Sequence, residues 1–261
     1  LSKLLHENGY KLSVWTVNQT ITMKRILVLK PDNITTKQYE RLNSVIENWG
    51  KSIMTNAEYL IAIDKRRSRR AFKPKPLDDA VKQLINELVA YVNEKAGLDF
   101  IFIDDARFAF KVQSGMTSLI AFCGPDTIPA RQACGYYGET IVLQCAFHGI
   151  GTCCVGSYNE NKVLEKLDLP KGHRLYCVIA IGNVSEKLSI KEKMIYAATH
   201  KNSKPYQKMF EVCDKKLPPY YEYAMKLVEK APSATNRRPV HFRYEDDIIK
   251  GYVDEPYSDK S

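Results

Sequence analysis

The chain has 261 residues, 44% of them hydrophobic, and a formal net charge of +9. This length suits one large domain or a domain with an added piece, and the hydrophobic fraction is ample for a buried core. No stretch of about 18 uninterrupted apolar residues is present, which argues against a membrane-spanning helix. The seven cysteines are odd in number and form no C-x-x-C pair, so we expect a protein of a reducing compartment, the cytoplasm.

Residues 1–58 have the pattern of a β-α-β unit. The stretch "KLSVWTVN" predicts a strand over 11–18, "QTITMKRILVLK" predicts a helix over 19–30, and "PDNITT" predicts a short strand over 31–36. A strand-helix-strand order implies that the two strands are parallel.

The same segment resembles the last part of a glycerophosphodiester phosphodiesterase barrel. The match is carried by Trp15–Asn18 at one strand end and by Asp32–Thr36 in the next strand. The histidines and metal-binding acids of that family lie earlier in its barrel, and a barrel cannot close from its last strands alone. The resemblance therefore implies a fragment without phosphodiesterase activity, and an ordinary β-α-β piece is the alternative.

Residues 59–261 form the predicted main body. It opens with a short helix that carries Tyr59 and Ile63, and an amphipathic helix follows over 74–97, with Asp78 favouring its start and Gly97 its end. We expect strands over 98–104, 117–125 and 175–183, helices over 136–151, 161–170 and 218–236, and a hairpin-like strand pair over 240–257. The 175–183 run is continuously apolar, which indicates a central strand. The predicted class is α+β, a mixed sheet flanked by helices, with the N-terminal β-α-β unit as an appendage.

Basic residues are densest in "DKRRSRRAF", between Asp64 and Phe72. Guanidinium groups form charge-assisted hydrogen bonds with phosphate, and a serine hydroxyl adds a neutral one. The net charge leaves three partner classes: nucleic acid, an anionic membrane surface and a phosphorylated small molecule. Aromatic residues do not interleave with this run as single-strand binders need, so we expect no nucleic acid. A solvated surface run is the alternative to a phosphate site.

Two other stretches have the composition of ligand-binding turns. Gly149, Gly151 and Gly156 follow the apolar helix and allow backbone to approach a flat ligand, or they simply end the helix. Ser233 and Asn236 lie in a polar loop after a helix, where they bind a ligand or form a capping turn. His148 and His173 have no partner at metal-ligand spacing, and we expect no metal site.

Taken together, these stretches resemble the nitroreductase family of flavin mononucleotide (FMN) enzymes over about 200 residues. The matching positions are Arg66, Arg67, Ser68, Arg70, Phe72, Glu139, Gly149–Gly156, Val178–Asn183, Ala231, Pro232, Ser233, Asn236, Arg238 and Pro239. In most members the Ala-Pro-Ser segment follows the arginine motif closely. Here it lies about 160 residues downstream, as in the thermophilic-type putative nitroreductase branch. Arg238 stands for the usual Gln, Val240 for the usual Trp, and Cys154 for the Trp of the glycine turn.

The resemblance implies a set of flavin contacts. The phosphate would lie on Arg66, Ser68 and Arg70, with Arg67 beside the ribityl chain or ring carbonyls. The glycine turn would contribute Gly149, Ile150 and Gly151, and the late loop would contribute Pro232, Ser233 and Asn236. A further basic residue, Lys204, would reach the phosphate. A solvated loop is the alternative for Lys204.

The resemblance also implies a flavin oxidoreductase that uses NADH or NADPH, in a ping-pong order, to reduce a nitro, quinone or similar small-molecule acceptor. No side chain need act as acid or base, because the flavin carries the chemistry. The family's dimeric site implies a homodimer. Two other classes remain open: a flavin- or nucleotide-binding protein without turnover, and a basic binder of nucleic acid or phospholipid head groups.

Overall fold

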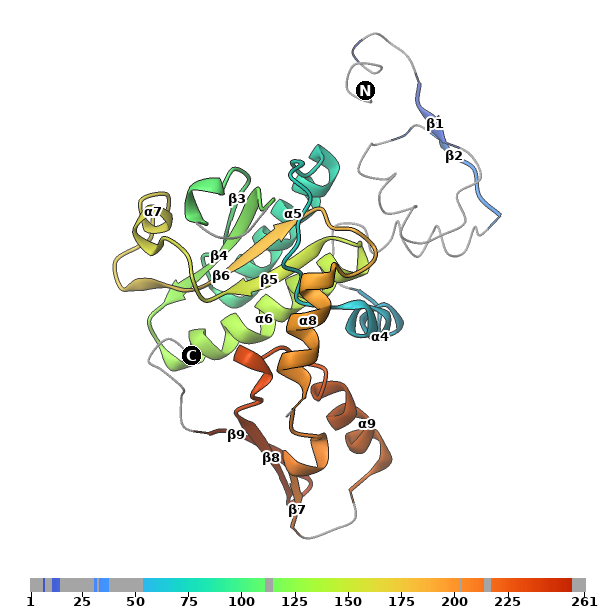
Figure 1. Ribbon diagram of the computed structural model, residues 1–261, viewed down its shortest axis with the longest axis vertical. Coiled ribbons are helices and arrows are strands. Elements are labelled where there is room, and N and C mark those ends of the chain that lie inside the picture. The colour runs from blue at the N-terminus through green and yellow to red at the C-terminus, as the bar shows by residue number, and fades with distance from the viewer. Residues whose placement is uncertain are drawn as a thin grey trace. The chain divides into compact units, whose positions relative to one another are not determined.

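The computed structural model describes residues 7, 11–14, 31, 33–37, 54–110, 115–201, 203–213 and 217–254. The chain divides into two compact units, Leu1–Glu186 and Lys187–Ser261, called here the first and second units. Both combine helices with sheets (Figure 1), so the predicted α+β class is confirmed. Among the described residues, none of the helices combines the length and apolarity that crossing a membrane needs.

Near the N-terminus, two short strands pair in parallel. Strand β1 (Ser13–Val14) lies beside β2 (Asn33–Ile34), and Thr35 N–H donates to the Val14 carbonyl at 2.8 Å. The parallel arrangement predicted for these segments is confirmed. The helix predicted over 19–30 lies outside the described residues.

The main sheet of the first unit has the strand order β3-β4-β6-β5, with every neighbouring pair antiparallel. The apolar run predicted as a central strand is β6, which lies between β4 and β5. The strands are β3 (Ile101–Ile103), β4 (Ser118–Pro125), β5 (Gly151–Val155) and β6 (His173–Gly182). A parallel element is added by residue Ser68, which bridges to Thr152 of β5.

Helices α5 (Asp79–Ala96) and α6 (Ile128–Phe147) pack on one face of this sheet (Figure 1). Their buried residues share a core cluster with Ile120 of β4 and Ile179 of β6. The opposite face is covered by α7 (Glu160–Leu164) and the 3₁₀ turn η1 (Arg107–Ala109), which share a second cluster with β4 and β6. Apolar side chains are therefore needed on both faces of β4 and β6, which explains their continuous hydrophobic runs.

Local signals place the helix ends of the first unit. The Asp78 side chain accepts a hydrogen bond from Val81 N–H at 3.0 Å, and Gly97 ends α5 with φ +61°. Helix α4 (Asn56–Lys65) begins with a reciprocal capping box between Thr55 and Glu58. Each of these helices was predicted from its sequence pattern.

The second unit carries a separate sheet with the order β7-β8-β9, in which β7 and β8 are parallel and β8 and β9 antiparallel. The β8–β9 hairpin confirms the predicted strand pair. Its two-residue turn is Asp246-Asp247, with φ of +53° and +61°, as a type I′ turn requires. The elements are α8 (Ile190–His200), η2 (Tyr206–Lys208), β7 (Phe210–Val212), α9 (Pro219–Val228), η3 (Ala234–Asn236), β8 (Val240–Glu245) and β9 (Ile248–Val253).

The structure corrects two predictions here and adds two elements that were not predicted. The helix predicted over 218–236 ends at Val228, and the rest is a loop that contains the short 3₁₀ turn Ala234–Asn236. Helix α8 and strand β7 were not predicted, although Ser189 and Glu192 form a capping box at the start of α8. The sequence predicted a single sheet, whereas β8 pairs with β7 and β9 pairs with β8, so these strands form a separate sheet.

Candidate functional site

The arginine segment, residues 66–70, lies along the edge of the main sheet. Helix α4 ends at Lys65, and the chain then runs beside β5: Ser68 bridges to Thr152, and Arg69 N–H donates to the Thr152 carbonyl at 2.8 Å. A second bridge joins Phe72 to Val184. The structure therefore brings Ser68 next to the strand that follows Gly149, two stretches that the sequence separates by about 80 residues.

The arginines of this segment have different surroundings. Arg69 is 8% exposed, and its Nη1 donates to the Ser185 carbonyl at 2.8 Å, so it holds the segment against the sheet. Arg67 is exposed and donates to the carbonyls of Asp64 and Arg66 at 2.8 and 2.7 Å. Arg70 is half-buried, and its Nη1 donates to the Ser68 carbonyl at 3.3 Å. The guanidinium groups of Arg67, Arg69 and Arg70 thus point to different carbonyl acceptors, which explains how like charges can lie in so short a stretch.

Arg66 turns toward α6, where it meets Glu139. The Arg66 Nε lies 3.8 Å from Glu139 Oε1, and the two side chains are 13% and 34% exposed. Burial lowers the pKa of the Arg66 guanidinium, and Glu139 opposes that shift. Burial raises the pKa of the Glu139 carboxyl to about 7, while Arg66 acts in the opposite direction. Arg66 stays protonated, so near neutral pH the charge of the pair depends on Glu139.

The glycine segment, residues 149–156, is a strand rather than a turn for most of its length. Gly149 follows α6 with φ +73°, which suits the helix end. The Ile150 side chain is buried in the core, and its N–H donates to the Cys145 carbonyl at 2.8 Å. At Gly151, an added Cβ would lie 2.2 Å from Val184 Cγ1, so packing against Val184 already requires glycine there.

The remaining predicted residues lie in the second unit. Ser233 Oγ accepts a hydrogen bond from Arg238 N–H at 2.9 Å, and Asn236 Nδ2 donates to the Thr199 carbonyl at 3.3 Å. Asn236 has φ +57°, in the left-handed region that asparagine tolerates. Pro232 is exposed. These bonds are those of a structured loop, and the amide of Asn236 ties it to the C-terminal end of α8.

Arg238, which stands where the family resemblance expects Gln, is 8% exposed. Its Nη1 donates to the Lys204 carbonyl and lies 3.5 Å from Glu229 Oε1. With its backbone bond to Ser233, this one residue connects the loop, the end of α9 and the segment after α8. The arginine therefore has a structural role inside the second unit.

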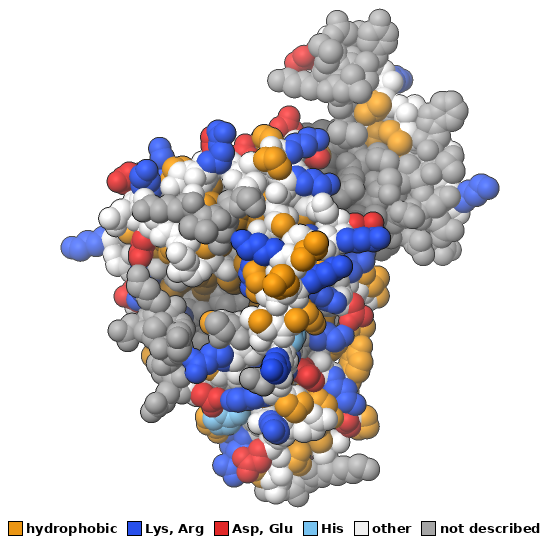
Figure 2. Space-filling view, viewed as in Figure 1, with side chains coloured by type: hydrophobic (Ala, Val, Ile, Leu, Met, Phe, Trp, Pro, Cys, Tyr) orange, Lys and Arg blue, Asp and Glu red, His pale blue; other side chains and the backbone are white. Residues whose placement is uncertain are grey.

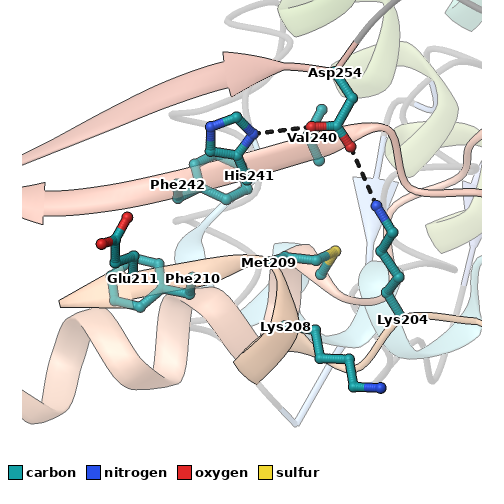
Figure 3. A pocket seen from close by; sticks show the side chains of 9 residues that line it. All are labelled: Lys204, Lys208, Met209, Phe210, Glu211, Val240, His241, Phe242 and Asp254. Carbon is teal, nitrogen blue, oxygen red and sulfur yellow. Dashed lines mark hydrogen bonds and ion pairs between the residues drawn. The ribbon is translucent and has the colours of Figure 1, made fainter.

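A cavity of ≈ 340 Å³ lies between η2, β7 and β8 in the second unit (Figure 3). At one side, Lys204 Nζ lies 3.1 Å from Asp254 Oδ2, and His241 Nδ1 lies 3.0 Å from Asp254 Oδ1. The hydrogen bond from His241, and then that from Lys204, holds the pKa of Asp254 below its usual range. The lining residues are Lys204, Lys208, Met209, Phe210, Glu211, Val240, His241, Phe242 and Asp254. Lys204 thus already has an acidic partner, a contact that the sequence did not reveal.

The sequence did not lead us to predict two charged contacts, those of Glu139 and of the His241–Asp254 pair. Each has a feature in the sequence that points to it. Glu139 was noted only as a matching position, yet it lies on helix α6, the helix that leads into Gly149. The His241–Asp254 pair follows from hairpin register: His241 lies opposite Tyr252 across the Asp-Asp turn, and Asp254 is two residues further on the same face. Recognising the turn at 246–247 predicts the pair.

A known protein family matches nearly all of the main body, residues 59–261. The family model described as "Putative TM nitroreductase" matches residues 58–258, well over half of the chain. No curated protein matches the chain.

A solved structure shares the fold. The crystal structure of a putative nitroreductase from Thermotoga maritima aligns with 78% of this chain and 79% of its own, at 20% identity and a TM-score of 0.53. Nitroreductases from Desulfitobacterium hafniense and Bacteroides fragilis, both with bound FMN, each align with 52% of this chain at 20% identity and a TM-score of 0.41, and with 95% and 92% of their own chains. The family match and the shared fold lead to one conclusion: this chain belongs to the family described as "Putative TM nitroreductase".

Proposed function

We propose that the protein is an FMN-dependent oxidoreductase that uses NADH or NADPH to reduce a nitro, quinone or similar small-molecule acceptor. Membership of a nitroreductase family supports the reaction class. The observation that carries the proposal is the bridge between Ser68 and Thr152, because it sets the arginine segment against the strand of the glycine segment.

The residues of the arginine segment fit a phosphate. Arg66 and Arg70 are partly buried cations two residues on either side of Ser68, and a partly buried guanidinium binds an anion more strongly than one in water. Arg69 holds the backbone of the segment in place through Ser185, which keeps its donors ordered. We infer that Arg66, Ser68 and Arg70 hold the phosphate, with Arg67 toward the ribityl chain or ring carbonyls.

The other inferred contacts follow the family resemblance. Gly149, Ile150 and Gly151 offer backbone groups to the ring, and Pro232, Ser233 and Asn236 contact the ring or ribityl chain. Lys204 already forms an ion pair with Asp254, so a structural role competes with its assignment to the phosphate. When bound, FMN supplies hydride acceptance and donation, and the protein supplies binding and electrostatics.

The proposal includes a ping-pong order, in which the oxidised nicotinamide leaves before the acceptor enters. It also includes a homodimer and a cytoplasmic location. Residues 1–58 are proposed as a separate segment, a fragment resembling the end of a glycerophosphodiester phosphodiesterase barrel, ahead of a nitroreductase-like FMN-binding domain over 59–261.

A second candidate, a flavin-binding protein without turnover, is favoured by Cys154, which stands where the family places Trp. A basic nucleic-acid or head-group binder has less support, since Lys and Arg side chains are spread over the visible face with Asp and Glu among them (Figure 2).

The absorbance spectrum of the purified protein tests the proposal. We expect flavin bands that bleach under anaerobic NADH or NADPH and return when an acceptor is added. Flavin that neither nicotinamide bleaches would support the binding protein instead. A protein that takes up no flavin would overturn both readings.

A further inference from the structure

We propose that Glu139 is a positioning residue that controls how much of the Arg66 charge is offered to a bound phosphate, so that FMN binding takes up a proton near neutral pH. The inference rests on the proposed function for its ligand. It concerns two side chains of the first unit, and it adds a residue outside the inferred set of phosphate contacts.

The geometry makes Glu139 a competitor for the cation that the phosphate needs. Arg66 Nε lies 3.8 Å from Glu139 Oε1, a separation typical of an ion pair rather than of a short hydrogen bond. The Arg66 side chain is 13% exposed, so water screens its charge less than it screens the charge of an exposed side chain. An ionised Glu139 therefore cancels much of the Arg66 charge, and a protonated Glu139 leaves it to an incoming anion.

The charged group that acts on the Glu139 carboxyl is Arg66, and Arg67 acts on Arg66 in turn. The other titratable groups around this part of α6 are Tyr59 of α4, Tyr91 of α5, Tyr136 of α6 itself, and Cys153 and Cys154 of β5. Burial raises the pKa of Tyr59, and it raises that of Cys154 to about 12. Strand β4 presents the apolar ring of Phe122 to Gly138. Among these groups, Glu139 has its pKa raised to about 7, so its ionisation changes near neutral pH.

The direction of the coupling follows from charge. A phosphate beside Arg66 adds negative charge near Glu139 and weakens the attraction that keeps Glu139 ionised, so the pKa of Glu139 rises further on binding. Affinity contributed by this residue is then greatest below pH 7 and falls as the pH rises through 7. A rise of one pKa unit from about 7 corresponds to an uptake of roughly 0.4 proton at pH 7. The phosphate acts in the opposite sense, because its second pKa of about 6 allows a release of at most ~0.1 proton there.

Calorimetric titration of FMN into the flavin-free full chain measures this uptake, when it is repeated at pH 7 in buffers of different ionisation enthalpy. We expect the wild type to show a net uptake of about 0.3–0.4 proton per FMN, because release from the phosphate offsets part of the uptake by Glu139. The Glu139→Gln variant should take up none, and its FMN affinity relative to wild type should rise about fivefold between pH 6 and pH 8 for a pKa rise of one unit. Glu94→Gln, an exposed glutamate on α5, is the matched control and should behave as wild type.

The outcomes separate the two proposals. FMN binding with equal proton uptake in wild type and Glu139→Gln would overturn the role of Glu139 and leave the proposed function standing. Absence of FMN binding by the wild type at every pH would overturn the proposed function and this inference with it. If Glu139→Gln does not fold, as judged by circular dichroism, the wild type alone decides: uptake that peaks near pH 7.5 supports the inference, and net release across pH 6–8 refutes it.

Discussion

Replacing Arg66 and Arg70 together by alanine should release FMN while leaving the fold intact. Both side chains belong to the arginine segment, but the bonds that hold this segment to the sheet come from Ser68, Arg69 and Phe72. Loss of Arg66 leaves Glu139 without its cation. Because the pKa of Glu139 is already about 7, the carboxyl takes up a proton instead of remaining as an isolated buried charge.

The expected loss follows from the bonds that each guanidinium makes to a phosphate. A hydrogen bond to a charged group contributes about 1.5–3 kcal/mol, so two such bonds contribute about 3–6 kcal/mol if they act independently. At 1.4 kcal/mol for each factor of ten, the dissociation constant of FMN should rise by roughly 10²- to 10⁴-fold.

Fluorescence quenching of FMN during titration measures this constant directly, and thermal unfolding checks the fold. The matched control is Arg107→Ala plus Arg131→Ala, which removes two charges whose side chains are 73% and 61% exposed. The control should change the affinity less than tenfold. Flavin retained by the Arg66 and Arg70 double variant at wild-type affinity, in a folded protein, would refute the assignment of the phosphate to this segment.

Four further outcomes are expected. Arg69→Ala should lower the free energy of unfolding in urea by about 2–3 kcal/mol, because a buried guanidinium loses its carbonyl partner and its packing; a change below about 0.5 kcal/mol would contradict that role. Gly151→Ala should cost about 1–3 kcal/mol through the clash with Val184, and adding Val184→Ala should recover part of it; an additive loss would count against the clash. In wild type the contribution of Glu139 to stability should fall as pH rises from about 4.5 to about 7, since the folded state holds its proton longer, and this slope should be missing from denaturation curves of Glu139→Gln. The stabilisation from Asp254, whose pKa is lowered, should be present above its unfolded pKa and vanish as pH falls through its folded pKa; Asp254→Asn should lack this acid-side loss, and an unchanged acid limb would contradict the ion-pair arrangement.

Much of the first unit follows from local rules that the sequence displays. The α5 helix is marked by its apolar spacing, by Asp78 at its start and by Gly97 at its end, and each of these acts within a turn or two. The β6 run is apolar throughout because both of its faces are covered, a condition that composition alone makes visible. The concentration of arginines and the glycine segment are likewise readable from residue types.

The sequence by itself determined most helices and strands of the first unit, and which stretches carry unusual chemistry. Only the tertiary structure decided that Ser68 lies beside Thr152, that Arg69 is used for packing while Arg66 faces Glu139, and that Lys204 is paired with Asp254. The physical reason is the distance along the chain between the interacting residues. Helix caps and strand patterns depend on neighbours a few residues away, whereas the charge available at a guanidinium depends on which distant carboxylate or carbonyl the fold brings within about 4 Å.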